Sequence, residues 1–185
     1  MHINSWICLA DWANHRTCNT FASTKDQSTA KQELERYLHY FTRYQAHKKS
    51  EEFAKKQLKT TEDMMIQSDN KHPVMDIQFM IDVNKQLIDC RRVLKYSYVY
   101  GYYNMNLAAA RTTASATTTI PFQKERFEQY QAVLEKFTES LSGLSEKPME
   151  NFDETIRADA VNQCRVVKKY IDNVLLHVEE GMDED

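Results

Sequence analysis

Two cysteines and one histidine near the start of the chain are the residues whose types and spacing could bind a metal ion. Cys8, His15 and Cys18 lie within one short segment, and thiolate and imidazole are ligands that zinc prefers. A structural zinc site takes four ligands, yet Ser5 stands where a Cys-x2-Cys pair would have its first member. Two alternatives stay open: an incomplete site with no zinc or a weakly held, water-completed ion, or a segment with two idle thiols.

The remaining cysteines, Cys90 and Cys164, fall on apolar rows of expected helices. Buried cysteine usually packs as a small hydrophobic side chain, and the sequence places no base beside either one. The chain also lacks a phosphate-binding loop, an HExxH helix and a readable Ser-His-Asp pattern. These observations favour a binding or regulatory module over a catalyst.

Tyrosines crowd the segment from Tyr96 to Tyr103. Such a run could line a ligand site, but a tyrosine stripe at helical spacing more often packs in the core with its hydroxyls reaching water or a neighbouring helix. We therefore expect these residues to belong to the core.

The balance of charge argues against nucleic acid as a partner. Basic and acidic side chains number 24 and 27, giving a net charge of −3, so we expect no nucleic-acid binding.

No apolar run approaches the roughly 20 residues needed to cross a bilayer, and we expect no membrane span. The start of the chain does not read as a secretory signal. We expect a reducing compartment, the cytoplasm, with the nucleus as a second option.

Glycine and proline are scarce, with three of each, which argues against an all-β fold and a glycine-dependent nucleotide-binding sheet. Apolar periodicity predicts a helix over 31–50, with a continuation or restart through Met65, and a break before Pro73. A long helix is predicted over 74–105, apolar on more than one face and therefore central.

The second half of the chain is also helical in pattern. Apolar residues spaced by three and four form a heptad seam, made of Phe127, Tyr130, Leu134, Phe137, Leu141 and Leu144. A last helix is predicted from about Asn151 to His177. The fold class predicted is all-α: an elongated antiparallel bundle of four to five helices with an irregular N-terminal segment.

Four segments, in order along the chain, resemble signatures of the Ariadne-type RING-between-RING ubiquitin ligases. Residues 5–21 look like the end of the RING2 module, roughly C-W-x-C-x-x-x-W-x-x-H followed by C-N-R-[FY]. Residues 34–47 resemble the helix RYLFYFxRYxxH, and residues 89–103 resemble CRxxLxYTYxxAYY. Residues 127–135 resemble FExxQAxLE. The resemblance covers nearly the whole chain.

This resemblance implies a division of the chain and a function. Residues 1–21 would be a remnant of the RING2 zinc module and residues 22–185 the Ariadne helical domain, with a flexible loop at 106–119. In such ligases RING1 recruits a ubiquitin-charged conjugating enzyme, and a RING2 cysteine takes ubiquitin as a thioester before passing it to a substrate. The Ariadne domain packs on RING2 and covers that cysteine, and release is linked to partners such as neddylated cullin-RING ligases.

The parent protein is thus expected to be a zinc-containing E3 ubiquitin transferase. Its catalytic cysteine and RING1 are expected upstream of Met1, so we expect this piece to be inactive alone and to act as an autoinhibitory, partner-sensing domain. The alternative, from a different class, is a helical adaptor bundle that docks a partner without controlling any active site.

The resemblance also implies a contact between the helical domain and RING2. In the family a Phe-Glu pair and a later Glu form it, and the matching positions are Phe53, Ala54 and Glu139, with alanine replacing the first acid. Because Phe137 and Leu141 lie on the seam, Glu139 is expected to point away from the core. Phe53 is expected near a helix start, and both residues are expected to be dispensable for folding.

Overall fold

The computed structural model describes residues 18–21, 29–67, 74–105, 119–147 and 153–180. These residues form four helices: α1 (Thr29–Gln67), α2 (Val74–Asn104), α4 (Thr119–Ser145) and α5 (Glu154–Glu179). The prediction of an all-α bundle is confirmed for this part of the chain. The expected loop lies outside the described residues except for Thr119, which begins α4.

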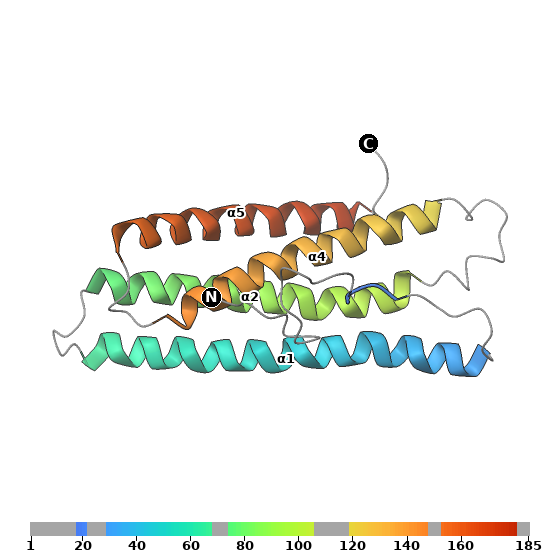
Figure 1. The fold of residues 1–185 in the computed structure, drawn as a ribbon, viewed down its shortest axis with the longest axis horizontal. Coiled ribbons are helices and arrows are strands. Elements are labelled where there is room, and N and C mark those ends of the chain that lie inside the picture. Colours follow the sequence, from blue (N-terminus) through green and yellow to red (C-terminus); the bar gives the residue numbers. More distant parts are fainter. Residues whose placement is uncertain (1–17, 22–28, 68–73, 106–118, 148–152, 181–185) are drawn as a thin grey trace.

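Helices α1 and α2 lie side by side as an antiparallel pair, and α4 crosses α2 obliquely with α5 beside it (Figure 1). Helix α2 packs against α1, α4 and α5, which explains why its apolar residues occupy more than one face. Its central position was correctly predicted. The helix over 31–50 does not restart but continues to Gln67, so that α1 has 39 residues.

The largest hydrophobic cluster lies where α2 meets the other three helices. Its buried members on α2 include Val83, Leu87 and Leu94, each at most 2% exposed. Helix α5 buries one narrow row, which consists of Ala160, Val167, Ile171 and Val174, and the first three of these belong to the cluster. Spacings of seven, four and three residues place that row on one face.

Local signals fix the start of the last helix. The Asp153 side chain accepts a hydrogen bond of 2.7 Å from the backbone amide of Ile156, which satisfies one of the amides left unpaired at a helix start. Helix α5 therefore begins three residues later than the sequence predicts. Among the described helices, none combines the length and apolar character needed to span a membrane.

Candidate functional site

Residues 18–21 lie against the bundle and join α1 to α4. The buried Asn19 donates a hydrogen bond from its amide nitrogen Nδ2 to the backbone oxygen of Glu128, at 2.7 Å. The backbone oxygen of Asn19 in turn accepts from Nε2 of His39, at 3.1 Å. One residue outside the helices therefore bonds to both α1 and α4.

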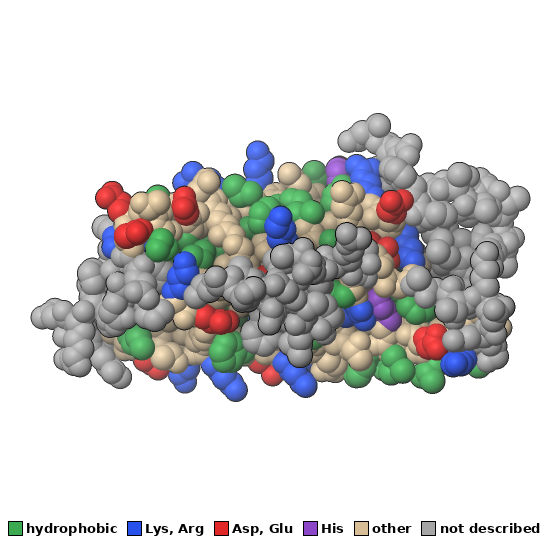
Figure 2. Space-filling view, viewed as in Figure 1, with side chains coloured by type: hydrophobic (Ala, Val, Ile, Leu, Met, Phe, Trp, Pro, Cys, Tyr) green, Lys and Arg blue, Asp and Glu red, His purple; other side chains and the backbone are tan. Residues whose placement is uncertain are grey.

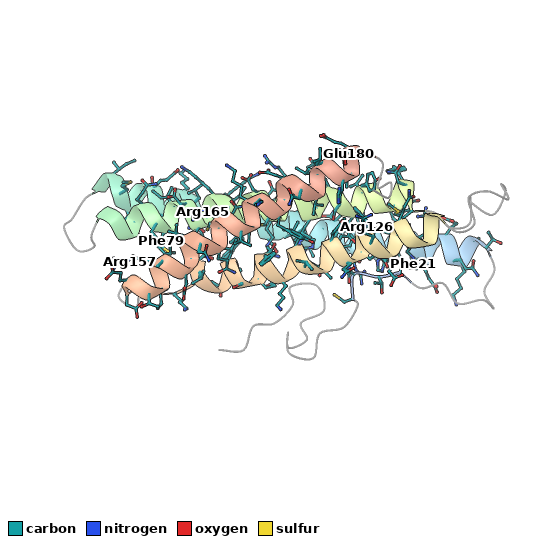
Figure 3. The ribbon with its side chains drawn as sticks, turned by 90° about the horizontal axis from the view of Figure 1, so that it is seen from above. Phe21, Phe79, Arg126, Arg157, Arg165 and Glu180 are labelled. Atoms are coloured by element: carbon teal, nitrogen blue, oxygen red, sulfur yellow. The ribbon has the colours of Figure 1, made fainter. Side chains whose placement is uncertain are left out.

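Two cations bind the backbone on either side of Asn19. Arg43 donates from Nε to the Cys18 oxygen at 2.6 Å, and its Nη2 donates to the same atom. Lys124 donates from Nζ to the Phe21 oxygen at 2.8 Å. Because charged donors make the stronger hydrogen bonds, these contacts fix the path of the segment without using its side chains. Figure 3 shows Phe21 beside α4, at the opposite end of the bundle from Phe79 and Arg157.

The histidine in this contact is held neutral. Burial lowers the pKa of His39 to about 4, and the nearby Arg43 adds to the shift. A neutral ring with its proton on Nε2 can donate to the Asn19 oxygen. The Phe21 ring packs edge-on against the same imidazole, with ring centroids 5.4 Å apart. The contact therefore combines directed hydrogen bonds with aromatic packing.

Of the three predicted zinc ligands, only Cys18 lies within the described residues, and it is half-buried. Cys8, His15 and also Ser5 lie outside them. Within the described part of the chain no group of three His, Cys, Asp or Glu side chains could hold a metal ion. Whether the incomplete zinc site forms therefore stays a prediction.

The two residues expected to contact RING2 differ sharply in their surroundings. Phe53 is 48% exposed, but it lies in the middle of α1 rather than near a helix start. Glu139 is buried, with Nη1 of Arg91 on α2 donating to its carboxylate at 3.1 Å. The expectation that Glu139 points away from the core is wrong. Ala54, where the family pattern has an acid, is 1% exposed in the hydrophobic cluster.

The error on Glu139 has a physical cause. Helix α4 buries a second face next to its apolar seam, and this second face carries polar side chains. Its buried polar residues are Gln131, Glu135, Thr138, Glu139, Ser142 and Ser145. Because these residues recur at spacings of three and four, they mark a helix face. The spacing of these polar residues is visible in the sequence. Because a polar row on a helix usually indicates a solvent-exposed face, their burial was not predicted.

Sequence reasoning also missed a buried group of polar aromatic residues. His47 on α1 stacks on Tyr98 of α2, with ring centroids 5.5 Å apart. The Tyr98 hydroxyl donates to Glu135 on α4, and Nε2 of His47 lies 3.7 Å from the same carboxylate. Burial lowers the pKa of His47. The group connects three helices through the core.

The cysteines on apolar rows pack as predicted. Cys90 is fully buried, and burial raises the pKa of its thiol to about 12. Burial likewise raises the pKa of the half-buried Cys164 to about 11. Both thiols therefore stay protonated at neutral pH and are poor nucleophiles.

The tyrosine run divides between core and surface. Tyr98 is fully buried as expected, whereas Tyr103 is 74% exposed. A pocket of about 210 Å³ opens between α1 and α2, with both tyrosines in its lining. The pocket is lined by Tyr37, Tyr40, Phe41, Tyr44, Tyr98, Val99, Tyr102 and Tyr103.

Comparison with known proteins gives a consistent result. The family model of the Ariadne domain matches residues 35–182. The chain is 30% identical over 198 residues to "Probable E3 ubiquitin-protein ligase ARI10" of Arabidopsis thaliana, covering 98% of the chain and 36% of that protein. It is 29% identical over 194 residues to "E3 ubiquitin-protein ligase ariadne-1" of Drosophila melanogaster, covering 97% of the chain and 35% of that protein. The chain thus spans about a third of the length of these relatives.

Proposed function

This chain belongs to the Ariadne domain family, and we propose that it is the regulatory domain of a RING-between-RING E3 ubiquitin ligase that covers its own RING2 module. The observation that carries the proposal is the attachment of residues 18–21 to α1 and α4. The sequence resembles the end of RING2 up to this segment. A module that ends there is therefore tethered to the helical domain at its last residues.

The surface that would face RING2 continues along α1. His39, Arg43, Ser50 and Phe53 share one side of the helix, since they are spaced by four, seven and three residues. His39 and Arg43 bind the segment, and Phe53 lies about 15 Å beyond Arg43 along the helix at 1.5 Å per residue. A hollow lies over this stretch, lined in part by Ser50 and Phe53. Phe53 is thus placed to give apolar contact area to the preceding module.

Glu139 acts differently from Phe53 in this proposal. Its carboxylate is fixed by Arg91 in the core, so its orientation is set before any contact with RING2 is made. A preorganised carboxylate loses little conformational entropy on accepting a further hydrogen bond. We retain Phe53 and Glu139 as the RING2 contact on the family resemblance.

The remaining parts of the function belong to the parent protein. A ubiquitin-conjugating enzyme would bind RING1, and ubiquitin would pass through a RING2 thioester to the substrate. A partner such as a neddylated cullin-RING ligase would release the contact. Zinc would be bound in the RING modules, with Cys18 as the one proposed ligand in the described residues.

The test is the rate of ubiquitin thioester formation at the RING2 cysteine of the longer ligase, measured without an activating partner. Phe53→Ala should raise the rate, and Phe53→Ala with Arg43→Gln should raise it further. A coupling of about 1 to 3 kcal/mol predicts a total increase of roughly 5- to 150-fold. Lys169→Ala on the far helix α5 is the matched control. Because Phe53 is half exposed, its variant should keep the melting temperature of the parent.

The adaptor alternative makes the opposite prediction. A helical bundle that only docks a partner leaves thioester formation unchanged in all these variants. It also predicts that this 185-residue chain, added in excess to a separate RING2 module, does not slow the reaction of that module. Unchanged rates in both experiments would reject regulation in favour of the adaptor.

A further inference from the structure

The side of α1 away from residues 18–21 carries a second, chemically different surface. Tyr37, Phe41, Tyr44 and Lys48 recur at spacings of four, three and four residues and share one helix face. Lys55 continues the same row seven residues further. By helix geometry at about 100° per residue, this row lies roughly opposite the row of His39 and Arg43. The two surfaces meet only at Phe41, which lines both the tyrosine pocket and the hollow beside Phe53.

The aromatic part of this row forms one wall of the pocket between α1 and α2. Tyr37 and Phe41 stack nearly parallel, at 5.4 Å and 15°, and are 45% and 40% exposed. Val99 and Tyr103 of α2 form the opposite wall, with Tyr103 74% exposed. Each residue lining the pocket is aromatic or aliphatic. Because tyrosine rings combine an apolar body with a hydroxyl, the pocket suits an apolar side chain whose flanking backbone accepts hydrogen bonds at the rim.

Beyond the pocket the same helix becomes strongly basic. From residue 48 to residue 59 the exposed charged side chains are Lys48, Lys49, Glu52, Lys55, Lys56 and Lys59. The second acid of this stretch, Glu51, is buried between Lys55 and Lys95. Figure 2 shows this change along its lower edge, where hydrophobic side chains gather over the first half of α1 and Lys and Arg over the second. An apolar pocket thus opens beside an excess of positive charge.

We propose that this face of α1 and α2 docks an acidic linear segment of a partner protein. One apolar side chain of the segment enters the tyrosine-lined pocket, and the carboxylates that follow it face Lys48 and Lys55. Charge complementarity selects this occupant, since the exposed lysines would attract carboxylates and repel a basic segment. The proposal does not depend on the regulatory function proposed above.

Helix geometry sets the spacing that the segment needs. Lys48 lies about 6 Å beyond Tyr44 along α1, and Lys55 about 16 Å, at 1.5 Å per residue. An extended peptide advances about 3.3 Å per residue. Because the side chains of an extended peptide alternate between two faces, carboxylates two and four residues after the apolar side chain share its face. They lie about 7 and 13 Å along the peptide, within reach of the long side chains of Lys48 and Lys55.

The experiment measures binding of the full 185-residue chain to a fluorescent synthetic peptide by anisotropy. The probe carries a leucine followed by glutamates two and four residues later, and two control peptides carry lysines in place of the glutamates or serine in place of the leucine. The first peptide should bind more tightly than both controls and weaken as salt rises. Lys48→Glu and Tyr103→Ser should each weaken it about five- to tenfold. Lys169→Glu on α5 makes the same charge change elsewhere and should leave the affinity unchanged.

Three outcomes would overturn the proposal. The first is equal binding of the glutamate and lysine peptides, since charge would then select nothing. The second is an equal loss of affinity in the Lys48→Glu and Lys169→Glu variants. The third is binding to anionic phosphatidylserine vesicles, abolished by Lys48→Glu, with no binding of the peptide. That result would assign the surface to a membrane instead. Circular dichroism of each variant separates lost binding from lost folding.

Discussion

The two ends of the α1–α2 pair are built from different chemistry. Where the second half of α1 meets the first half of α2, the buried apolar side chains are mostly aliphatic, as at Ala54, Val83 and Leu87. Where the first half of α1 meets the second half of α2, the buried residues include His47 and Tyr98. This second end also holds residues 18–21 and the tyrosine pocket. Burial of apolar area needs no particular partner, whereas the buried hydrogen bond from Tyr98 to Glu135 does, so the binding surfaces lie beside a directed contact between helices.

The largest expected effect comes from removing the ion pair between Arg91 and Glu139, which lies at the border between the two ends. Arg91→Met should lower the free energy of unfolding by about 3 to 5 kcal/mol, because it leaves the buried Glu139 carboxylate without its cation. Chemical denaturation measures the loss. Arg91→Met combined with Glu139→Leu should recover most of it, since an apolar pair avoids burying charge. A single variant as stable as the parent would show that Glu139 is solvated.

A matched change among the aliphatic core residues should lower the free energy of unfolding by slightly less, and no second substitution is expected to restore it. Leu87 is 2% exposed, and Leu87→Ala should lower the free energy of unfolding by about 3 kcal/mol through lost burial and a residual cavity. Thioester control and peptide docking should survive at temperatures where the variant is folded. If either function fails in the folded variant, the division between the two ends does not hold.

Gly101 tests how tightly the end with the stacked aromatic rings is packed. A methyl group at this position would lie 2.9 Å from a ring carbon of Tyr40 and 3.4 Å from one of Phe127. Both rings are buried. Gly101→Ala should therefore lower the free energy of unfolding by about 1 to 3 kcal/mol, although alanine favours helices. A higher melting temperature would mean that Tyr40 moves aside freely.

The smallest expected effect is a dependence of stability on pH at the contact with residues 18–21. Burial and Arg43 depress the pKa of His39 from 6.5 to about 4, so the folded state favours the neutral ring. Its contribution to stability is fully present above pH 6.5 and declines as pH falls towards 4, because the unfolded state then binds more protons. His39→Gln should flatten the fall in melting temperature between pH 6.5 and 5. His177→Gln, which removes a histidine from α5, serves as control, and identical slopes for both variants would contradict the prediction.

The sequence was sufficient for most of the fold but for less of the site. Apolar periodicity predicted α2 and the seam of α4 because those residues are both hydrophobic and buried. It left open whether α1 continues or restarts after Ser50, since the later part of α1 is mostly polar and packs through a narrow row that includes Ala54. The burial of Glu139 was missed for a related reason. A buried acid and a solvated acid look alike until the cation that faces it, here Arg91 in another helix, is known.

The contact of residues 18–21 could not be predicted from local patterns either. Its donors are side chains, but its acceptors are backbone oxygens of Cys18, Asn19, Phe21 and Glu128. Every residue type carries such an oxygen, so within the segment only the donating side chain of Asn19 depends on residue type. Only the resemblance to a preceding zinc module suggested that this segment would lie on the helices.

The polar face of α4 restricts how far the helix can shift along its axis relative to its neighbours. Its apolar seam repeats every seven residues from Phe127 to Leu141, so a shift of one heptad, about 10 Å along the axis, would place similar side chains against the neighbouring helices. The polar residues do not repeat in this way. A shifted helix would carry Glu139 away from Arg91 and Glu135 away from Tyr98, which leaves buried groups unpaired. The two contacts thus select a single register from several that hydrophobic packing alone would accept.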